Sequence, residues 1–445
     1  MSVSPKAESL EAGTLRAVTV RLVPLLMALY FVNFLDRTNL GIAKAEVSKD
    51  LQLSATMFGL ASGIFFIGYV LVEVPSNLAL VRFGARRWLA RIAVSWGIVA
   101  VAIAFAPNAT TLLVLRFLLG VAEAGLFPGV VFYLSQWFPA AYRARVVGVF
   151  MLAVPLASAI GTPLAAWLVQ TGHGTFGLDG WRFMMICVGL PAVLLGVVCW
   201  FYLTDRPADA HWLTDDQRSW LIDTLAGEEH RVSSRYHFPL RRTLTSPRVW
   251  AMAVVYFSVA YGLYALAFFL PSIVAGFRKT FGIQLSLIQV GLITAIPDLF
   301  GAIAMFLWSR HADRTREHVW HVALPLALGG LAIPVALYLH HPVAVMVPVV
   351  IAAVGIFAAM PVFWALPTRF LTGAAAAGGI GLINSLGNVG GFAAPYATGA
   401  LEDLTGTNKA GMWALGIVMV IGAALVVWLR ATPGADRQDQ DAGKA

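Results

Sequence analysis

The sequence predicts an all-α integral membrane protein in which twelve transmembrane helices form two six-helix bundles related by pseudo-symmetry. Three observations predict this class: the composition, the lengths of the apolar runs and the placement of the basic residues. Hydrophobic residues make up 59% of the 445 residues and charged residues 12%. A soluble protein carries about 25% charged residues, so this much apolar surface requires lipid as its solvent.

Each of twelve apolar runs is long enough to cross an apolar layer about 30 Å thick, because a helix rises about 1.5 Å per residue. The first run follows a mixed polar segment, residues 1–20, and no small-residue cleavage site comes after it. We therefore expect this run to be a retained span and not a removable signal peptide. The predicted spans are 21–42, 56–80, 88–106, 110–136, 144–170, 182–203, 249–276, 283–308, 319–340, 343–366, 372–402 and 410–429.

Lys and Arg concentrate before the first span and in every second connection after it. Because an excess of basic residues marks cytoplasmic loops, we expect both termini in the cytoplasm of a multi-pass protein, in a membrane of the bacterial inner-membrane type. The predicted parts are a cytoplasmic tail 1–20, a bundle 21–203, a cytoplasmic linker 204–248, a bundle 249–430 and a cytoplasmic tail 431–445.

The formal net charge of +8 does not indicate nucleic-acid binding. The basic residues are scattered over many short loops and form no binding stripe. Two of these loops, 82–87 and 310–316, follow the second span of each half. Basic loops at equivalent places in two halves indicate parallel internal repeats around a central solute path.

Several stretches resemble a known family of transporters. They are 30–39 (YFVNFLDRTN), 74–77 (VPSN), 116–125 (RFLLGVAEAG), 133–139 (YLSQWFP) and 384–391 (NSLGNVGG). Together with the paired basic loops they resemble the anion:cation symporter family of the major facilitator superfamily.

Two further stretches narrow the resemblance within that family. Residues 53–60 (LSATMFGL) and 308–314 (WSRHADR) are most similar to the branch of 4-hydroxyphenylacetate permease and tartrate transporter. The resemblance implies the major facilitator fold. It also implies import of a small organic anion (a hydroxy acid, a sugar acid or an aromatic carboxylate) by proton-coupled symport with alternating access.

Ionisable residues inside the spans are the main candidates for function, because each costs a few kcal/mol at mid-membrane. Asp36 and Arg37 lie in the first span. Arg116 lies in the fourth span at a depth similar to Asp36, and Glu123 lies two turns deeper on the same face. An arginine fork matches a carboxylate, and a buried acid changes its protonation when its surroundings change. We predict that Arg37 and Arg116 bind substrate and that Asp36 and Glu123 carry protons, as the resemblance also implies. The alternative is two ion pairs that only hold the spans together.

Four further residues are predicted substrate contacts. Asn384 and Asn388 are one turn apart in the eleventh span, and buried amides need partners. The alternative for them is helix–helix hydrogen bonding in a glycine-rich span. Tyr30 and Trp364 are the aromatic candidates, chosen by their positions in the resemblance.

Charged residues near the predicted cytoplasmic ends of spans are predicted to form a gate or latch. Asp298 follows Pro297 in the eighth span, and we leave its role open between an extra coupling group, a gate residue and an ion-pair partner of Arg310. The predicted gate residues are Glu73, Arg82, Arg86, Arg87, Asp313 and Arg314.

Other classes of function remain as alternatives. A proton-coupled antiporter of the same fold is the nearest, although the Gly-Pro pair typical of such exporters is interrupted in 158–163 (SAIGTP). A channel would need a repeated filter motif, and an enzyme a catalytic motif, neither of which the sequence contains. We expect no cofactor and no metal. The expected partners are a small organic anion, a proton or sodium ion and the lipid bilayer, with no nucleic acid and a monomeric protein.

Overall fold

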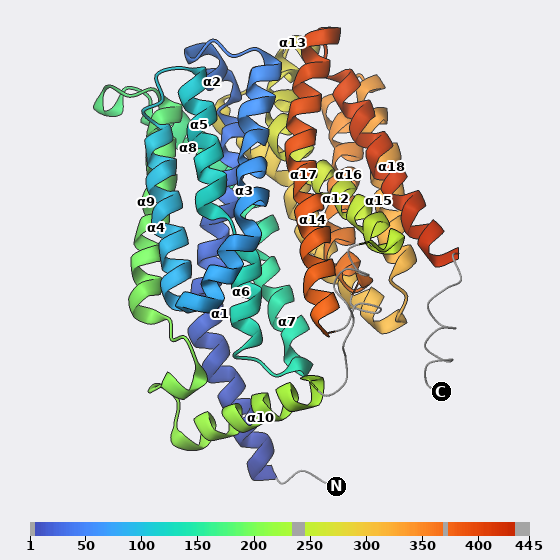
Figure 1. Cartoon of the computed structure of the whole chain (residues 1–445). Helices are drawn as coiled ribbons and strands as arrows, with labels where there is room; N and C mark the ends of the chain where they lie inside the picture. The colour runs from blue at the N-terminus through green and yellow to red at the C-terminus, as the bar shows by residue number, and fades with distance from the viewer. Residues whose placement is uncertain (1–4, 234–244, 368–372, 432–445) are drawn as a thin grey trace. The chain divides into compact units, whose positions relative to one another are not determined.

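A computed structural model describes residues 5–233, 245–367 and 373–431 (Figure 1). The described residues are almost entirely helical and contain no strand. The α-helices are α1 Pro5–Ile42, α2 Lys44–Asp50, α3 Ala55–Phe83, α4 Ala85–Ile103, α5 Ala109–Glu123, α6 Leu126–Ser135, α7 Ala140–Met151, α8 Ala153–Gly172, α9 Gly180–Tyr202, α10 Asp215–Ser233, α12 Pro247–Ala275, α13 Phe277–Phe281, α14 Leu287–Thr315, α15 Val319–Val335, α16 Pro342–Trp364, α17 Gly373–Thr405 and α18 Lys409–Ala431.

The predicted spans coincide with these helices. Within the described residues, ten helical segments are long and apolar enough to cross a membrane, and α4 and α17 occupy the two remaining predicted positions. The prediction of an all-α polytopic fold is therefore confirmed. Two segments predicted to be polar also hold helix: α1 begins at Pro5, and the linker contains α10. The tail 431–445 lies outside the described residues after Ala431.

The fourth predicted span is broken into α5 and α6 immediately after Glu123. Gly125 has φ of +89°, a conformation that costs a residue with a Cβ far more than glycine. A Cβ at Gly125 would also lie 2.5 Å from Ser76 Oγ, and this hydroxyl donates to the carbonyl of Ala124 at 2.6 Å. The break makes Glu123 the last residue of α5.

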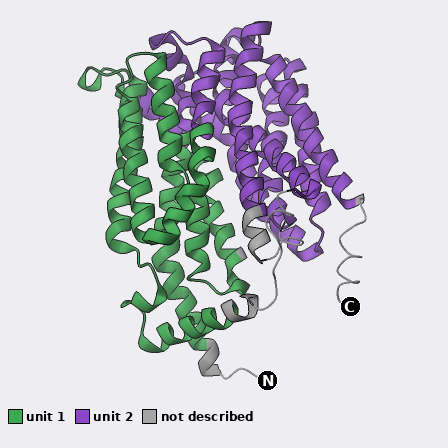
Figure 2. Ribbon diagram, viewed as in Figure 1, with its two compact units in different colours: residues 1–37, 67–157, 171–236 green, residues 38–66, 158–170, 237–445 purple. Residues whose placement is uncertain are grey.

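The chain forms two compact units (Figure 2). Unit 1 comprises residues 1–37, 67–157 and 171–236, and unit 2 comprises 38–66, 158–170 and 237–445. The boundaries cut α1, α3 and α8, so unit 2 contains segments from both halves of the sequence. The repeat relating 21–203 to 249–430 concerns the sequence and stays a prediction.

Within unit 2, the beginning of α3 packs directly on α17. A Cβ at Gly59 would lie 2.2 Å from the carbonyl oxygen of Pro395, so this close approach of two backbones requires glycine. Phe66 meets Tyr264 of α12 edge-on, with ring centroids 4.4 Å apart. These contacts join helices whose ends are predicted to face outside the cell.

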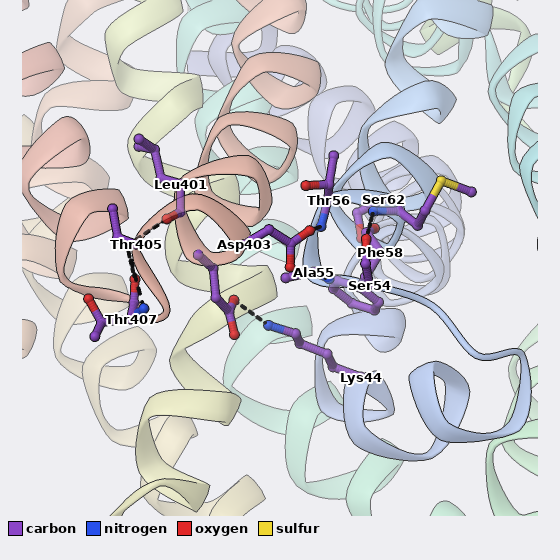
Figure 3. A network of polar contacts seen from close by, with 12 residues as sticks. Lys44, Ser54, Ala55, Thr56, Phe58, Ser62, Leu401, Asp403, Thr405 and Thr407 are labelled. Carbon is purple, nitrogen blue, oxygen red and sulfur yellow. Dashed lines mark hydrogen bonds and ion pairs between the residues drawn. The ribbon is translucent and has the colours of Figure 1, made fainter.

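Polar contacts complete this packing at the same ends of the helices (Figure 3). Lys44 Nζ of α2 lies 2.9 Å from Glu402 Oε2 of α17. The carboxylate of Asp403 accepts the backbone N–H groups of Ala55 at 3.2 Å and of Thr56 at 2.7 Å. These N–H groups begin α3 and have no partner within the helix. We call Lys44, Ala55, Thr56, Glu402 and Asp403 the outer network.

Candidate functional site

Unit 1 brings together Arg37 and Glu123, two residues predicted to carry function. Arg37 Nε on α1 donates to Glu123 Oε2 on α5 at 2.8 Å. The side chains are 5% and 0% exposed, respectively. Burial removes both charges from water, so each depends on the other and on local hydrogen bonds for compensation.

A third buried residue, Asn33, binds the same carboxylate. Its Nδ2 donates to Glu123 Oε2 at 2.7 Å, and the residue is fully buried. Asn33 is not among the site residues predicted from the sequence. A usable signal was present, because Asn33 precedes Arg37 by four residues and therefore shares its face of α1.

Asp36 and Arg116 are each 1% exposed. Arg116 precedes Glu123 by two turns on α5 and interacts electrostatically with Asp36, Glu123 and Arg37. Tyr69 of α3 lies beneath Arg37, with its ring centroid 4.9 Å from Cζ. The four predicted charged residues thus belong to one buried cluster, which we call the charge cluster: Asp36, Arg37, Arg116 and Glu123.

Tyr30 lies three residues before Asn33 on α1. Its ring stacks on Phe150 at 4.7 Å and tilts against Phe127 at 5.6 Å between centroids. The side chain is 6% exposed. This packing fixes the ring in an aromatic layer of unit 1, and its contact with substrate stays a prediction.

The other predicted substrate contacts lie in unit 2. Asn384 is buried, and Asn388 Nδ2 donates to the backbone carbonyl of Asn384 at 3.1 Å. The ring of Trp364 lies 4.7 Å from that of Tyr256. Tyr256 in turn packs against Gly387, where a Cβ would lie 2.0 Å from the ring. Tyr256 therefore contacts both Trp364 and the segment of α17 that carries the two asparagines.

The predicted gate residues have varied surroundings. Glu73 is buried on α3, one turn beyond Tyr69. Arg86 is held through its backbone N–H, which donates to Asp205 at 2.8 Å. Asp313 has a side chain 81% exposed, 3.9 Å from His318. Arg82, Arg87 and Arg314 are exposed. No gating role is tested by these positions, and it stays a prediction for all six.

Asp298 is half-buried on α14, four residues after the buried Thr294. No pattern in the sequence indicated a contact between α14 and α15, in which Nδ1 of His311 on α14 lies 2.7 Å from Nε2 of His321 on α15. Among the residues that the structure describes, no group of three His, Cys, Asp or Glu side chains is arranged to hold a metal ion.

A sequence model of the Major Facilitator Superfamily matches residues 26–395 of this chain. The chain belongs to the Major Facilitator Superfamily. Membership makes it a transport protein and not an enzyme, and it confirms the predicted fold class. The family resemblance found in the sequence is supported by the relatives below.

Relatives in this superfamily match nearly the whole chain. A "Putative tartrate transporter" of Agrobacterium vitis is 46% identical over 429 residues, which cover 96% of this chain and 93% of the relative. A "Quinolone resistance transporter" of Acinetobacter baumannii is 40% identical, covering 93% and 94%. A crystal structure of a bacterial homologue of the human lysosomal transporter Spinster matches with a TM-score of 0.71 at 18% identity, covering 92% of this chain and 96% of that one. At this identity the structural match concerns the fold.

Proposed function

We propose that the protein is a secondary active transporter that imports a small organic anion together with protons. The observation that carries this proposal is the buried contact between Arg37 and Glu123, 2.8 Å long in unit 1. A buried arginine is a binding group for a carboxylate. A buried acid next to that arginine can carry a proton, because its preference for the charged or neutral form depends on whether the arginine compensates it.

The charge cluster explains why anion and proton would bind together. Its two arginines and two acids carry formal charges that sum to zero. When an organic anion engages Arg37, Glu123 loses part of its compensation, and an isolated buried carboxylate favours its neutral form. Proton binding therefore becomes more favourable when the anion is present, and linkage makes the effect reciprocal. Asp36 is the second proposed carrier, beside Arg116.

Two relatives and the proposed binding groups support a hydroxy acid as the substrate. The names of two relatives, 46% and 45% identical, refer to tartrate, a hydroxy acid with two carboxylates. Arg37 and Arg116 supply two guanidinium groups, and Asn384 and Asn388 supply amides suited to hydroxyl groups. Tyr30 and Trp364 are proposed to limit the size of the substrate. A thermal-shift screen of purified protein against tartrate, sugar acids and aromatic acids tests which of these acids the protein binds best.

Alternating access requires the outer network of unit 2 to break whenever the path opens to the outside. We propose that Lys44–Glu402 and the Asp403 bonds act as this outer closure. Glu73, Arg82, Arg86, Arg87, Asp313 and Arg314 are proposed to act at the cytoplasmic side, with both termini in the cytoplasm and the protein in the inner membrane.

The direct test replaces Glu123 with Gln, which mimics the protonated acid. We expect Glu123→Gln to bind and exchange substrate in proteoliposomes, but to lose accumulation driven by a pH gradient, because a glutamine amide neither takes up nor releases a proton. A sodium gradient, imposed without a pH gradient, tests the other coupling ion. Full proton-driven accumulation by this variant would show that Glu123 is not the coupling acid.

A proton-coupled antiporter that exports its substrate is the second candidate. The observation favouring it is the relative named for quinolone resistance, 40% identical to this chain. Vesicles with an acidic outside distinguish the two functions. A symporter accumulates labelled substrate under this gradient, whereas an antiporter expels preloaded substrate.

A further inference from the structure

Asn33 and Glu123 share one hydrogen bond, and each also has one side-chain oxygen without a hydrogen-bond partner in the part of the chain that the structure describes. Asn33 Nδ2 donates to Glu123 Oε2, whereas Asn33 Oδ1 and Glu123 Oε1 are buried and have no hydrogen-bond partner among the described residues. Both residues are fully buried. Buried polar atoms are almost always satisfied, so two unsatisfied oxygens on two bonded side chains require an explanation.

The chemistry of the two groups supplies one. An ionised carboxylate accepts hydrogen bonds and donates none, so it can use the amide N–H but not the amide oxygen. A protonated carboxyl has one O–H donor in addition to its carbonyl oxygen. It can therefore accept from the amide N–H and donate to the amide oxygen at the same time, in a two-bond ring.

We propose that the coupling proton binds to Glu123 Oε1 and is held there by a hydrogen bond to Asn33 Oδ1. The inference rests on the proposed function, in which Glu123 carries that proton, and it adds Asn33 as the second member of the proton site. The proton comes from water on one side of the membrane and returns to water on the other. No other covalent bond forms or breaks.

The occupancy of Oε2 supports protonation at Oε1. Oε2 accepts from both Asn33 Nδ2 at 2.7 Å and Arg37 Nε at 2.8 Å, and a proton there would displace a donor. Oε1 is available without that loss. The charged and titratable groups around the pair are Asp36, Arg37 and Tyr30 on α1, Tyr69 and Glu73 on α3 and Arg116 on α5.

Asn33 also suits both stages of the cycle. When Glu123 is ionised, the Asn33 amide stabilises its charge by donating from Nδ2 to Oε2. In the protonated state, after Arg37 has engaged substrate, it retains that bond and gains a second one. An aliphatic side chain of similar size offers neither bond, so Asn33→Leu removes the partner in both states.

Infrared difference spectroscopy of the purified protein, titrated from alkaline to acidic pH, tests the bond directly. We expect a protonated-carboxyl C=O band that Glu123→Gln removes. In Asn33→Leu, this band should move to higher wavenumber, as for an acid without a hydrogen-bonded partner. An unchanged band in Asn33→Leu overturns the role of Asn33 alone. If Glu123→Gln removes no band, Glu123 does not protonate, and the proposed function fails as well.

Transport provides a second test that does not depend on the leucine variant folding. Asn33→Asp places two carboxyls at hydrogen-bond distance, and these cannot both ionise readily. The pair should keep its proton to higher pH, so the alkaline limit of uptake should move upward. A wild-type pH profile for Asn33→Asp overturns the proposal.

A matched control separates this role from packing. For Asn33→Leu, we expect proton-driven accumulation to fall about ten-fold, as for the loss of one buried hydrogen bond, while counterflow is retained. Asn77→Leu makes the same change on α3, where the amide donates to the backbone carbonyl of Glu73, and it should leave the pH profile unchanged. An equal fall in accumulation and counterflow for Asn33→Leu would indicate a structural role and would overturn the proposal.

Discussion

Two ion pairs in this protein have nearly the same length but very different surroundings. Arg37–Glu123 in unit 1 is 2.8 Å long, with side chains 5% and 0% exposed. Lys44–Glu402 in unit 2 is 2.9 Å long, with side chains 13% and 26% exposed. The first lies inside a helical bundle, and the second lies where helices end.

The difference in burial predicts different consequences for the two pairs. Removing one partner of a buried pair leaves the other charge without water or counter-charge, which is strongly destabilising. Removing one partner of a pair that water still reaches has a small effect, because solvent replaces it. The buried pair is therefore sensitive to any ligand that competes for its arginine, whereas the outer pair can open and close at low cost.

The largest expected effect comes from Arg37→Ala. It should lower the free energy of unfolding by about 3–5 kcal/mol, since Glu123 would be left as an uncompensated buried charge. Thermal unfolding of the purified protein measures the change. Combining Arg37→Ala with Glu123→Gln should restore most of the stability without restoring transport.

Arg37→Lys provides the matched control for this first prediction. It keeps the charge but loses the planar fork, so it should retain more stability than Arg37→Ala and still lose most substrate binding. Near-normal affinity for substrate in Arg37→Lys would remove Arg37 from the binding site. It would leave the buried pair as a structural contact between α1 and α5.

A much smaller effect is expected from Lys44→Ala. The free energy that separates the closed from the outward-open state should change by at most about 1 kcal/mol. This corresponds to a change of roughly five-fold in the equilibrium constant between these two states. Ser62 is fully buried on α3, so Ser62→Cys, in a chain without Cys187 and Cys199, reports outward opening by its labelling rate. We expect that rate to rise by up to about five-fold.

Charge exchange sharpens this second prediction. Lys44→Glu combined with Glu402→Lys should return the labelling rate to its original value, because the pair is rebuilt in reverse. Lys49→Ala changes an exposed lysine of the same short helix and should have no effect. A rate unchanged by Lys44→Ala would show that the outer pair does not hold the closure.

These two regions also differ in how far the sequence could predict them. The spans were predictable because the apolar runs match the membrane in length. The charge cluster was partly within reach, because counting residues along two spans places Arg116 at a depth similar to Asp36. The same count places Glu123 two turns deeper than Arg116, so the direct contact between Arg37 and Glu123 depends on how the helices pack. The break after Glu123 was not predictable, since Gly125 shares its apolar run with Gly120, Pro128 and Gly129, and the sequence does not say which of them interrupts the helix.

The outer network and Asn33 were missed for physical reasons. Lys44 and Glu402 are 358 residues apart, and charged residues at helix ends are usually solvated. An amide within a span is consistent with many partners, and the sequence does not say which one faces Asn33 across 90 residues. Helix periodicity predicts the face that a side chain occupies, but its partner depends on how helices pack.

The smallest effect is expected from pH on the outer network. Asp403 lies just beyond the predicted span 372–402. Hydrogen bonds from Thr56, followed by those from the Ser54 side chain and the Ala55 backbone, hold the pKa of Asp403 below its ordinary value. A carboxylate with a lowered pKa stabilises the state that lowers it. This stabilisation is complete above the ordinary pKa of about 3.9 and is lost only as pH falls through the lowered value. The labelling rate of Ser62→Cys is divided by that of the exposed Thr407→Cys, which corrects for the effect of pH on the labelling reaction itself. This ratio should therefore be constant between about pH 5 and 8. A change in this range, persisting in Glu123→Gln, would mean that the outer network itself titrates and that proton sensing is not confined to unit 1.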